Sequence, residues 1–103
     1  MIDRIEILIT RATIIDLKAT VDYNTKECII NDETYSVTDE FLKELKDLLY
    51  GWTNEYGNSN KIDREEFFIN VISTNDTTTY HGKGNYPLNY SRLRELLGEV
   101  YGK

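Results

Sequence analysis

The beginning of the chain alternates apolar and polar residues with the period of a β-strand. Three isoleucines share one face of residues 5–9, and leucine, alanine, valine and tyrosine share one face of residues 15–23. Period two over this length is typical of a strand with one face in a core and the other in water. The first third of the chain therefore predicts an antiparallel meander.

Shorter strands are predicted at residues 27–30 and 34–37, because the Asn31-Asp32 pair between them suits a tight hairpin turn. Two more strands are predicted at residues 66–74 and 77–81. Apolar residues occur on both faces of the first of these, so we expect that strand to be covered on both sides.

Two amphipathic helices are predicted by apolar residues at helical spacing. The first begins at Thr38, a good N-cap residue, and its apolar stripe runs from Phe41 to Trp52. The second begins at Asn89, also a good cap, and its stripe occupies residues 93–101. Each stripe needs an apolar surface against which to bury.

The simplest arrangement that buries both stripes is an α+β domain in which two helices pack on one face of a sheet. We expect a single domain over residues 1–103, with a four- or five-stranded antiparallel sheet in the order β-β-(β)-α-β-β-α. Residues 53–61 are polar and contain a Gly-Asn-Ser-Asn run, so they are expected to form a loop.

The charge of the chain is unevenly distributed. The formal net charge is −6, and residues 32–66 alone hold ten acidic and four basic side chains, a balance of −6. A surface of this sign repels nucleic-acid backbones and favours a basic partner. The same charge would also serve solubility alone, and that interpretation stays open.

No catalytic or metal-binding motif is present. The single cysteine, Cys28, lies in an apolar stretch and can form no internal disulfide. His81 and Lys83 fall in a His-Gly-Lys-Gly run that lacks the spacing of a phosphate-binding loop. We therefore expect no enzyme, no catalytic residue, no cofactor and no metal. A small-ligand or nucleotide-binding domain that uses His81 and Lys83 is kept as an alternative.

No apolar run approaches the roughly 18 residues that a membrane-spanning helix needs. The first residues interleave charge with apolar side chains and do not have the pattern of a signal peptide. The expected location is the cytoplasm, without membrane contact.

Three segments resemble a family of small acidic phage anti-CRISPR proteins, which block the RNA-guided nuclease of type II systems. The resemblance covers residues 33–68 and is carried by Glu33–Val37, Gly51–Tyr56 and Asp63–Phe68. In that family the acidic stretch that matches the last segment is helical, whereas here residues 66–74 alternate as a strand.

The resemblance implies a nucleic-acid mimic. Its carboxylates, at Glu55, Asp63, Glu65 and Glu66, would imitate the DNA element that paired arginines of the nuclease read. The implied partner is a basic, nucleic-acid-binding effector nuclease, and direct binding of nucleic acid is not expected.

The main functional hypothesis is a non-catalytic inhibitor or interaction protein that places an acidic surface on a basic protein. The candidate partner-binding residues are Glu55, Tyr56, Asp63, Glu65, Glu66, Asp39 and Glu40. The alternative is a small structural or protein-binding module, of a phage or a bacterium, whose charge serves only solubility.

Overall fold

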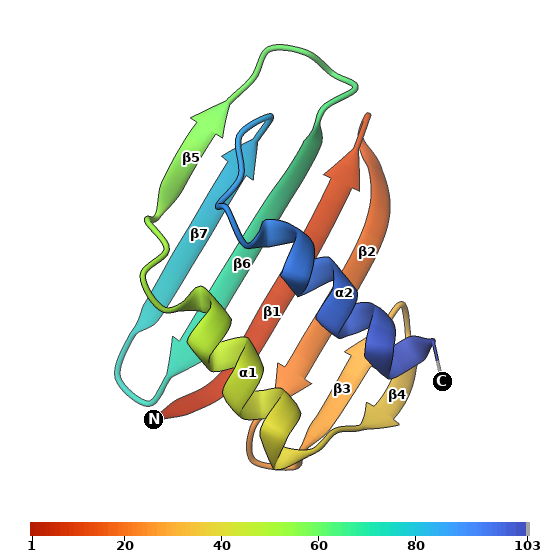
Figure 1. The fold of residues 1–103 in the computed structure, drawn as a ribbon, viewed down its shortest axis with the longest axis vertical. Coiled ribbons are helices and arrows are strands. Elements are labelled where there is room, and N and C mark those ends of the chain that lie inside the picture. Colours follow the sequence, from red (N-terminus) through yellow and green to blue (C-terminus); the bar gives the residue numbers. More distant parts are fainter. Residues whose placement is uncertain (103) are drawn as a thin grey trace.

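Seven strands form one mixed sheet, and two helices lie on one of its faces (Figure 1). The computed structural model describes residues 1–102. The strands are β1 (Ile2–Arg11), β2 (Ile14–Asp22), β3 (Glu27–Ile30), β4 (Glu33–Ser36), β5 (Glu55–Asn58), β6 (Glu65–Ser73) and β7 (Thr77–Lys83). The helices are α1 (Asp39–Leu49) and α2 (Tyr90–Tyr101). The strand order across the sheet is β4-β3-β2-β1-β6-β7-β5.

The long strand β1 is the centre of the sheet. Ile7 on β1 pairs with Ala19 on β2 and with Ile69 on β6, and all three side chains are buried. Every neighbouring pair of strands is antiparallel except β5 and β7, which are parallel. This agrees with the predicted α+β class and corrects the expectation of a purely antiparallel sheet.

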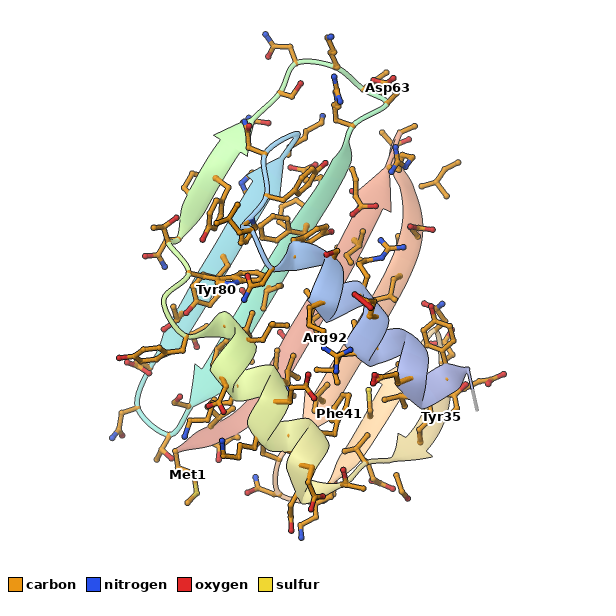
Figure 2. The ribbon with its side chains drawn as sticks, viewed as in Figure 1. Met1, Tyr35, Phe41, Asp63, Tyr80 and Arg92 are labelled. Atoms are coloured by element: carbon orange, nitrogen blue, oxygen red, sulfur yellow. The ribbon has the colours of Figure 1, made fainter. Side chains whose placement is uncertain are left out.

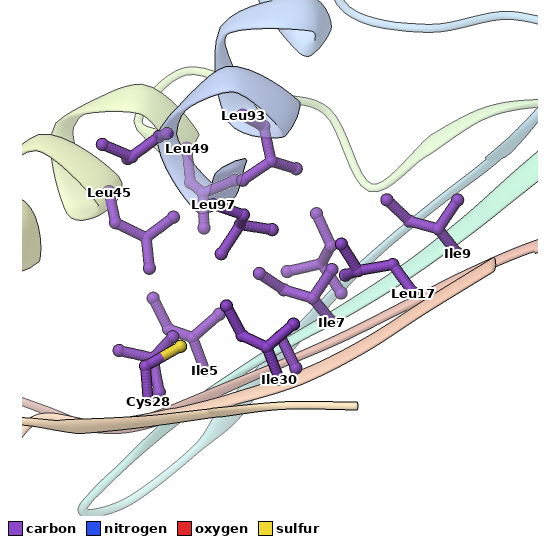
Figure 3. Packing of buried hydrophobic residues seen from close by; sticks show 14 of the residues in the cluster. Ile5, Ile7, Ile9, Leu17, Cys28, Ile30, Leu45, Leu49, Leu93 and Leu97 are labelled. Carbon is purple, nitrogen blue, oxygen red and sulfur yellow. The ribbon is translucent and has the colours of Figure 1, made fainter. Parts of the chain in front are cut away.

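The core lies between the sheet and the helix layer. Leu45 of α1 and Leu97 of α2 are fully buried and face isoleucines of β1 (Figure 3). The expectation that both helices pack on one face is therefore confirmed. Burial of about 18 such side chains stabilises the fold at roughly 25 cal/mol for each Å² of apolar surface removed from water.

The opposite face of the sheet carries no helix among residues 1–102. Phe68 and Ile72 of β6 are half-buried there, while Phe67 and Ile69, which alternate with them, are buried on the helix side. The expectation that this strand is covered on both sides was wrong. Antiparallel sheets can leave one face in water, and apolar residues occur on such faces as well.

The predicted number of four or five strands was also wrong. Residues 55–58 were expected to be a loop, yet they form β5 at the sheet edge. The strand is held by backbone hydrogen bonds that flank it, from His81 N to Asn54 O at 2.9 Å and from Ser59 N to Lys83 O at 3.1 Å. A four-residue polar strand that contains glycine has no alternating pattern, so only its tertiary partner reveals it.

The helix starts were predicted with mixed success. Thr38 caps α1, since its Oγ1 accepts a hydrogen bond from Phe41 N at 3.1 Å. Asn89 occupies the cap position of α2 but makes no capping bond. Its side chain instead accepts from Trp52 Nε1 at 2.8 Å and donates to Leu48 O at 3.1 Å. Trp52 itself lies beyond the end of α1, contrary to the predicted stripe.

Neither helix is long and apolar enough to cross a bilayer, within the residues that the structure describes.

Candidate functional site

A groove with an acidic rim lies between the two helices. It has a volume of about 220 Å³ and lies where the start of α1 meets the end of α2. Phe41, Leu96 and Val100 contribute apolar surface, and no cationic side chain of residues 1–102 lines it. Its rim carries three carboxylates, at Glu40, Glu44 and Glu99.

Arg92 joins two of these rim carboxylates. Its Nε donates to Glu44 at 2.8 Å and its Nη1 donates to Glu99 at 3.2 Å (Figure 2 labels Arg92 and Phe41). These hydrogen bonds raise the pKa of Arg92, so it stays charged. Glu40 is exposed and forms no ion pair with the described residues. Three carboxylates and one guanidinium leave the groove region with a local charge of −2.

A second cluster ties β5 to the sheet through His81. The imidazole Nδ1 lies 2.7 Å from Glu55 Oε1, and Nε2 lies 2.6 Å from Glu66 Oε2. Its ring centroid lies 4.9 Å from that of Phe68, with the two rings tilted by 35°. Each ring nitrogen faces a carboxylate, which can only accept when ionised, so the geometry suits the doubly protonated imidazolium.

The protonation of His81 follows from its surroundings. Burial by itself would lower the pKa of His81, but hydrogen bonds to Glu66 and Glu55 and the charge of both carboxylates outweigh it. The pKa is raised above the usual 6.5. The hydrogen bond to His81 lowers the pKa of Glu55 in turn. The result is a charged clamp, in which the imidazolium of His81 pairs with the carboxylates of Glu55 and Glu66.

Glu65 points to the opposite side of the sheet from Glu66 and belongs to a third network. Its carboxylate accepts from Tyr90 Oη at 2.5 Å, from Arg94 Nη1 at 3.0 Å and from Arg11 Nη2 at 3.4 Å. The Glu65 side chain is 13% exposed. Its role in this geometry is to join β6, β1 and α2, and little of it is open to a partner.

The remaining predicted site residues lie apart from one another. Asp63 is exposed in the β5–β6 loop, at the far end of the long axis from Met1 (Figure 2). Asp39 begins α1 and pairs with Lys26 at 3.0 Å. Tyr56 is half-buried and packs edge-on against Trp52. The ten acidic residues of the middle segment therefore do not gather on one face.

The fold brings together some of the predicted residues and separates the others. Glu55 and Glu66 meet at His81, and Glu65 lies on the adjacent position of β6. The groove adds Glu99 and Arg92, which sequence reasoning missed. Glu44 and Arg92 are 48 positions apart, and no local pattern signals a contact between two helices at that separation.

The His81 and Lys83 alternative gains no support from this arrangement. Both ring nitrogens of His81 are occupied by carboxylates, which would repel a phosphate. Within residues 1–102, no three His, Cys, Asp or Glu side chains are arranged so that they could hold a metal ion. Cys28 is buried, and burial raises the pKa of its thiol to about 11, so it is not a nucleophile at neutral pH.

The uncovered face of the sheet holds a shallower depression of about 260 Å³. Leu8 and Phe68 are cross-strand neighbours in it, and both Glu6 and Lys18 border it. Because the charges that border the depression are of both signs, the depression itself does not select a partner by charge.

No protein-family model, curated protein or solved structure matches this chain.

Proposed function

We propose that this chain is a non-catalytic protein-binding protein that docks the acidic edge of its helix layer onto a basic partner. It acts by occupying the partner's basic surface, as a stoichiometric inhibitor does. The observation that carries the proposal is the α1–α2 groove, whose rim has three carboxylates and whose lining includes no cation from the described part of the chain. Complementary charge raises association rates and selects partners of the opposite sign.

The nucleic-acid mimic implied by the anti-CRISPR resemblance is the narrower form of this proposal. It would rely on Glu55, Asp63, Glu65 and Glu66. Three of these four carboxylates are bound to His81 or to arginines of the same chain. Breaking such pairs would cost part of the binding energy. In the groove, Glu44 and Glu99 share one guanidinium and Glu40 has no ion partner among residues 1–102, so the groove keeps a net negative charge and is the better-supported surface.

A plain protein-binding module is the second candidate, and the uncovered sheet face favours it. Half-buried Leu8 and Phe68 lie side by side there, bordered by charges of both signs. Binding through this face would depend on apolar burial and would change little with salt.

Capture of the natural partner from the source cells tests the proposal and separates the two candidates. The baits are the wild type, the groove variant Glu40→Gln/Glu99→Gln, and a control, Asp32→Asn/Asp76→Asn, that removes the same charge from two exposed turns. We expect wild type and control to retain one basic protein at low salt, and the groove variant to lose it. Equal retention by all three baits, unaffected by salt, would contradict the proposal and support the second candidate.

A further inference from the structure

The apolar lining of the α1–α2 groove suggests what kind of segment a basic partner inserts. Phe41 and Leu96 form its buried floor, at 8% and 3% exposure, and the half-buried side chains of Val37 and Val100 flank them. Its volume of about 220 Å³ equals roughly seven water molecules at about 30 Å³ each. That space suits one large aliphatic or aromatic side chain.

Two helix ends meet at the groove, and their backbone dipoles have opposite signs. The carbonyl end of α2 carries a partial negative charge, and its last turn, which contains Glu99 and Val100, holds no basic residue within the described part of the chain. The amide end of α1, which begins at Asp39, carries a partial positive charge beside the same groove. The two helix ends offset each other, so the rim carboxylates are what selects a cation.

The apolar floor and the acidic rim lie within one groove, and each selects a different part of a ligand. The floor favours an apolar side chain, while the rim carboxylates favour lysine or arginine beside it. A helix with one apolar face and basic flanks presents this combination, as in other helix-in-groove complexes. Resting on the proposed function, we infer that the α1–α2 groove binds a basic amphipathic helix of the partner, anchored by one large apolar side chain.

The geometry of the rim accounts for the expected strength of charge selection. A lysine ammonium about 4 Å from one carboxylate gains about fivefold in affinity in a water-like dielectric, and more where the contact is partly buried. Glu40 offers an exposed carboxylate without an ion partner among residues 1–102. Glu44 and Glu99 each keep lone pairs beyond those that Arg92 occupies.

A synthetic helix tests the inference without knowledge of the natural partner. The probe is a peptide of about 15 residues made of leucine and lysine at helical spacing. One control peptide has the same composition in scrambled order, and another has glutamate in place of lysine. Backbone amide shifts of the full chain report where each peptide binds, and titration gives its affinity.

Two variants of the protein separate groove filling from a general surface effect. Val100→Trp adds a large side chain at the groove, and Leu88→Trp adds the same ring at a fully exposed position in the loop before α2. Thermal unfolding checks that both variants fold.

We expect the amphipathic peptide to shift amides of residues 37–44 and 96–101, with weaker binding of the scrambled peptide and none of the acidic one. Val100→Trp should weaken binding at least about tenfold, which corresponds to about 1.4 kcal/mol, and Leu88→Trp should leave it unchanged. Salt-sensitive binding that is equal for both basic peptides and for Val100→Trp would overturn the inference and leave the proposed function standing. Absence of binding by either basic peptide, or shifts confined to the uncovered sheet face, would also overturn it. The shift map of the wild type decides the question if Val100→Trp does not fold.

Discussion

Arg92 of α2 donates through Nε to Glu44 of α1 at 2.8 Å, and this contact joins the two helices beside the groove. The same guanidinium donates to Glu99, about two turns further along α2, at 3.2 Å. Among residues 1–102, Arg92 is thus the cation that pairs with rim carboxylates, and it contacts two of the three. Its pairs are half-exposed and screened by water, so their contribution to folding stability is small.

Replacing Arg92 by Gln should strengthen the binding of a basic partner, although it removes an ion pair. The local charge at the groove changes from −2 to −3. A unit charge about 7 Å from a bound ammonium is worth about 0.6 kcal/mol in water, or about a threefold gain in affinity. Titration with the leucine-lysine peptide measures the change. Weaker binding, in a variant whose thermal unfolding is nearly unchanged, would contradict the electrostatic account.

Glu65 should matter for stability more than for binding. The change Glu65→Gln removes the charge that accepts from Tyr90, Arg94 and Arg11 in a site that is 13% exposed. Hydrogen bonds to charged groups contribute about 1.5–3 kcal/mol, so we expect the free energy of unfolding to fall by about 2 kcal/mol.

Asp63→Asn is the matched control for Glu65, because Asp63 is exposed and only its backbone carbonyl is engaged, by Arg11. Its effect should lie within about 0.5 kcal/mol of zero, as for most surface changes. Urea unfolding measures both variants. Equal stabilities for the two variants would show that the network around Glu65 contributes nothing.

His81 should make the protein less stable as the pH rises above neutrality. Its pKa is raised in the folded state, so the clamp with Glu55 and Glu66 contributes fully below about pH 6.5. That stability is lost as the pH rises through the raised pKa. The chain has one histidine, so His81→Gln should remove most of the slope between about pH 6 and pH 8.5. If the variant kept the same slope of unfolding free energy against pH, a group other than His81 would be the cause of the pH dependence.

Glu55 predicts the opposite trend in acid. Its pKa is lowered by the hydrogen bond to His81, so its contribution is present above the unfolded pKa and is lost as the pH falls through the folded one. The protein should therefore be most stable at a pH between the lowered pKa of Glu55 and the raised pKa of His81. Unfolding free energies measured across this pH range locate the maximum.

The β1–β2 hairpin turn should gain stability from glycine. Ala12 and Thr13 both have positive φ angles, 51° and 65°, and a β-branched residue is strained there. Glycine avoids the cost of about 1–2 kcal/mol that other residues pay in the left-handed conformation. It also gives the unfolded chain more conformational freedom, which destabilises the fold by about 0.5–1 kcal/mol. Thr13→Gly should therefore stabilise the fold by up to about 1 kcal/mol. Thr25→Gly, the same change in another turn without a positive φ, should destabilise it. Thermal unfolding of both variants provides the comparison.

Patterns with a strong period were enough to predict most of the fold. The alternation around Ile7 predicted the central strands, and the stripe that includes Leu45 predicted a helix on the correct face. Thr38 marked the start of α1 because capping is local in sequence. The edge strand β5 was missed, since residues 55–58 become a strand only through their neighbours on β7, whereas the opposite edge strand, β4, was predicted from its hairpin turn.

The candidate site was harder to predict for a related reason. The charge excess of residues 32–66 was visible, but its arrangement depends on cations from outside that segment. Arg94 neutralises Glu65 from 29 positions away, and Arg92 reaches Glu44 from 48 positions away. Glu99, outside the segment, completes the groove instead. Counting charges along the sequence could not reveal which carboxylates are already paired.

The salt dependence of binding tests the central claim most directly. The affinity of the leucine-lysine peptide would be measured between about 50 mM and about 500 mM NaCl, for the wild type and for Glu40→Gln/Glu99→Gln. We predict that the wild-type affinity falls steeply with salt, and that the variant binds more weakly at low salt with a clearly shallower slope. Identical affinities and slopes for the two proteins would contradict the account, because the groove carboxylates would then take no part in binding.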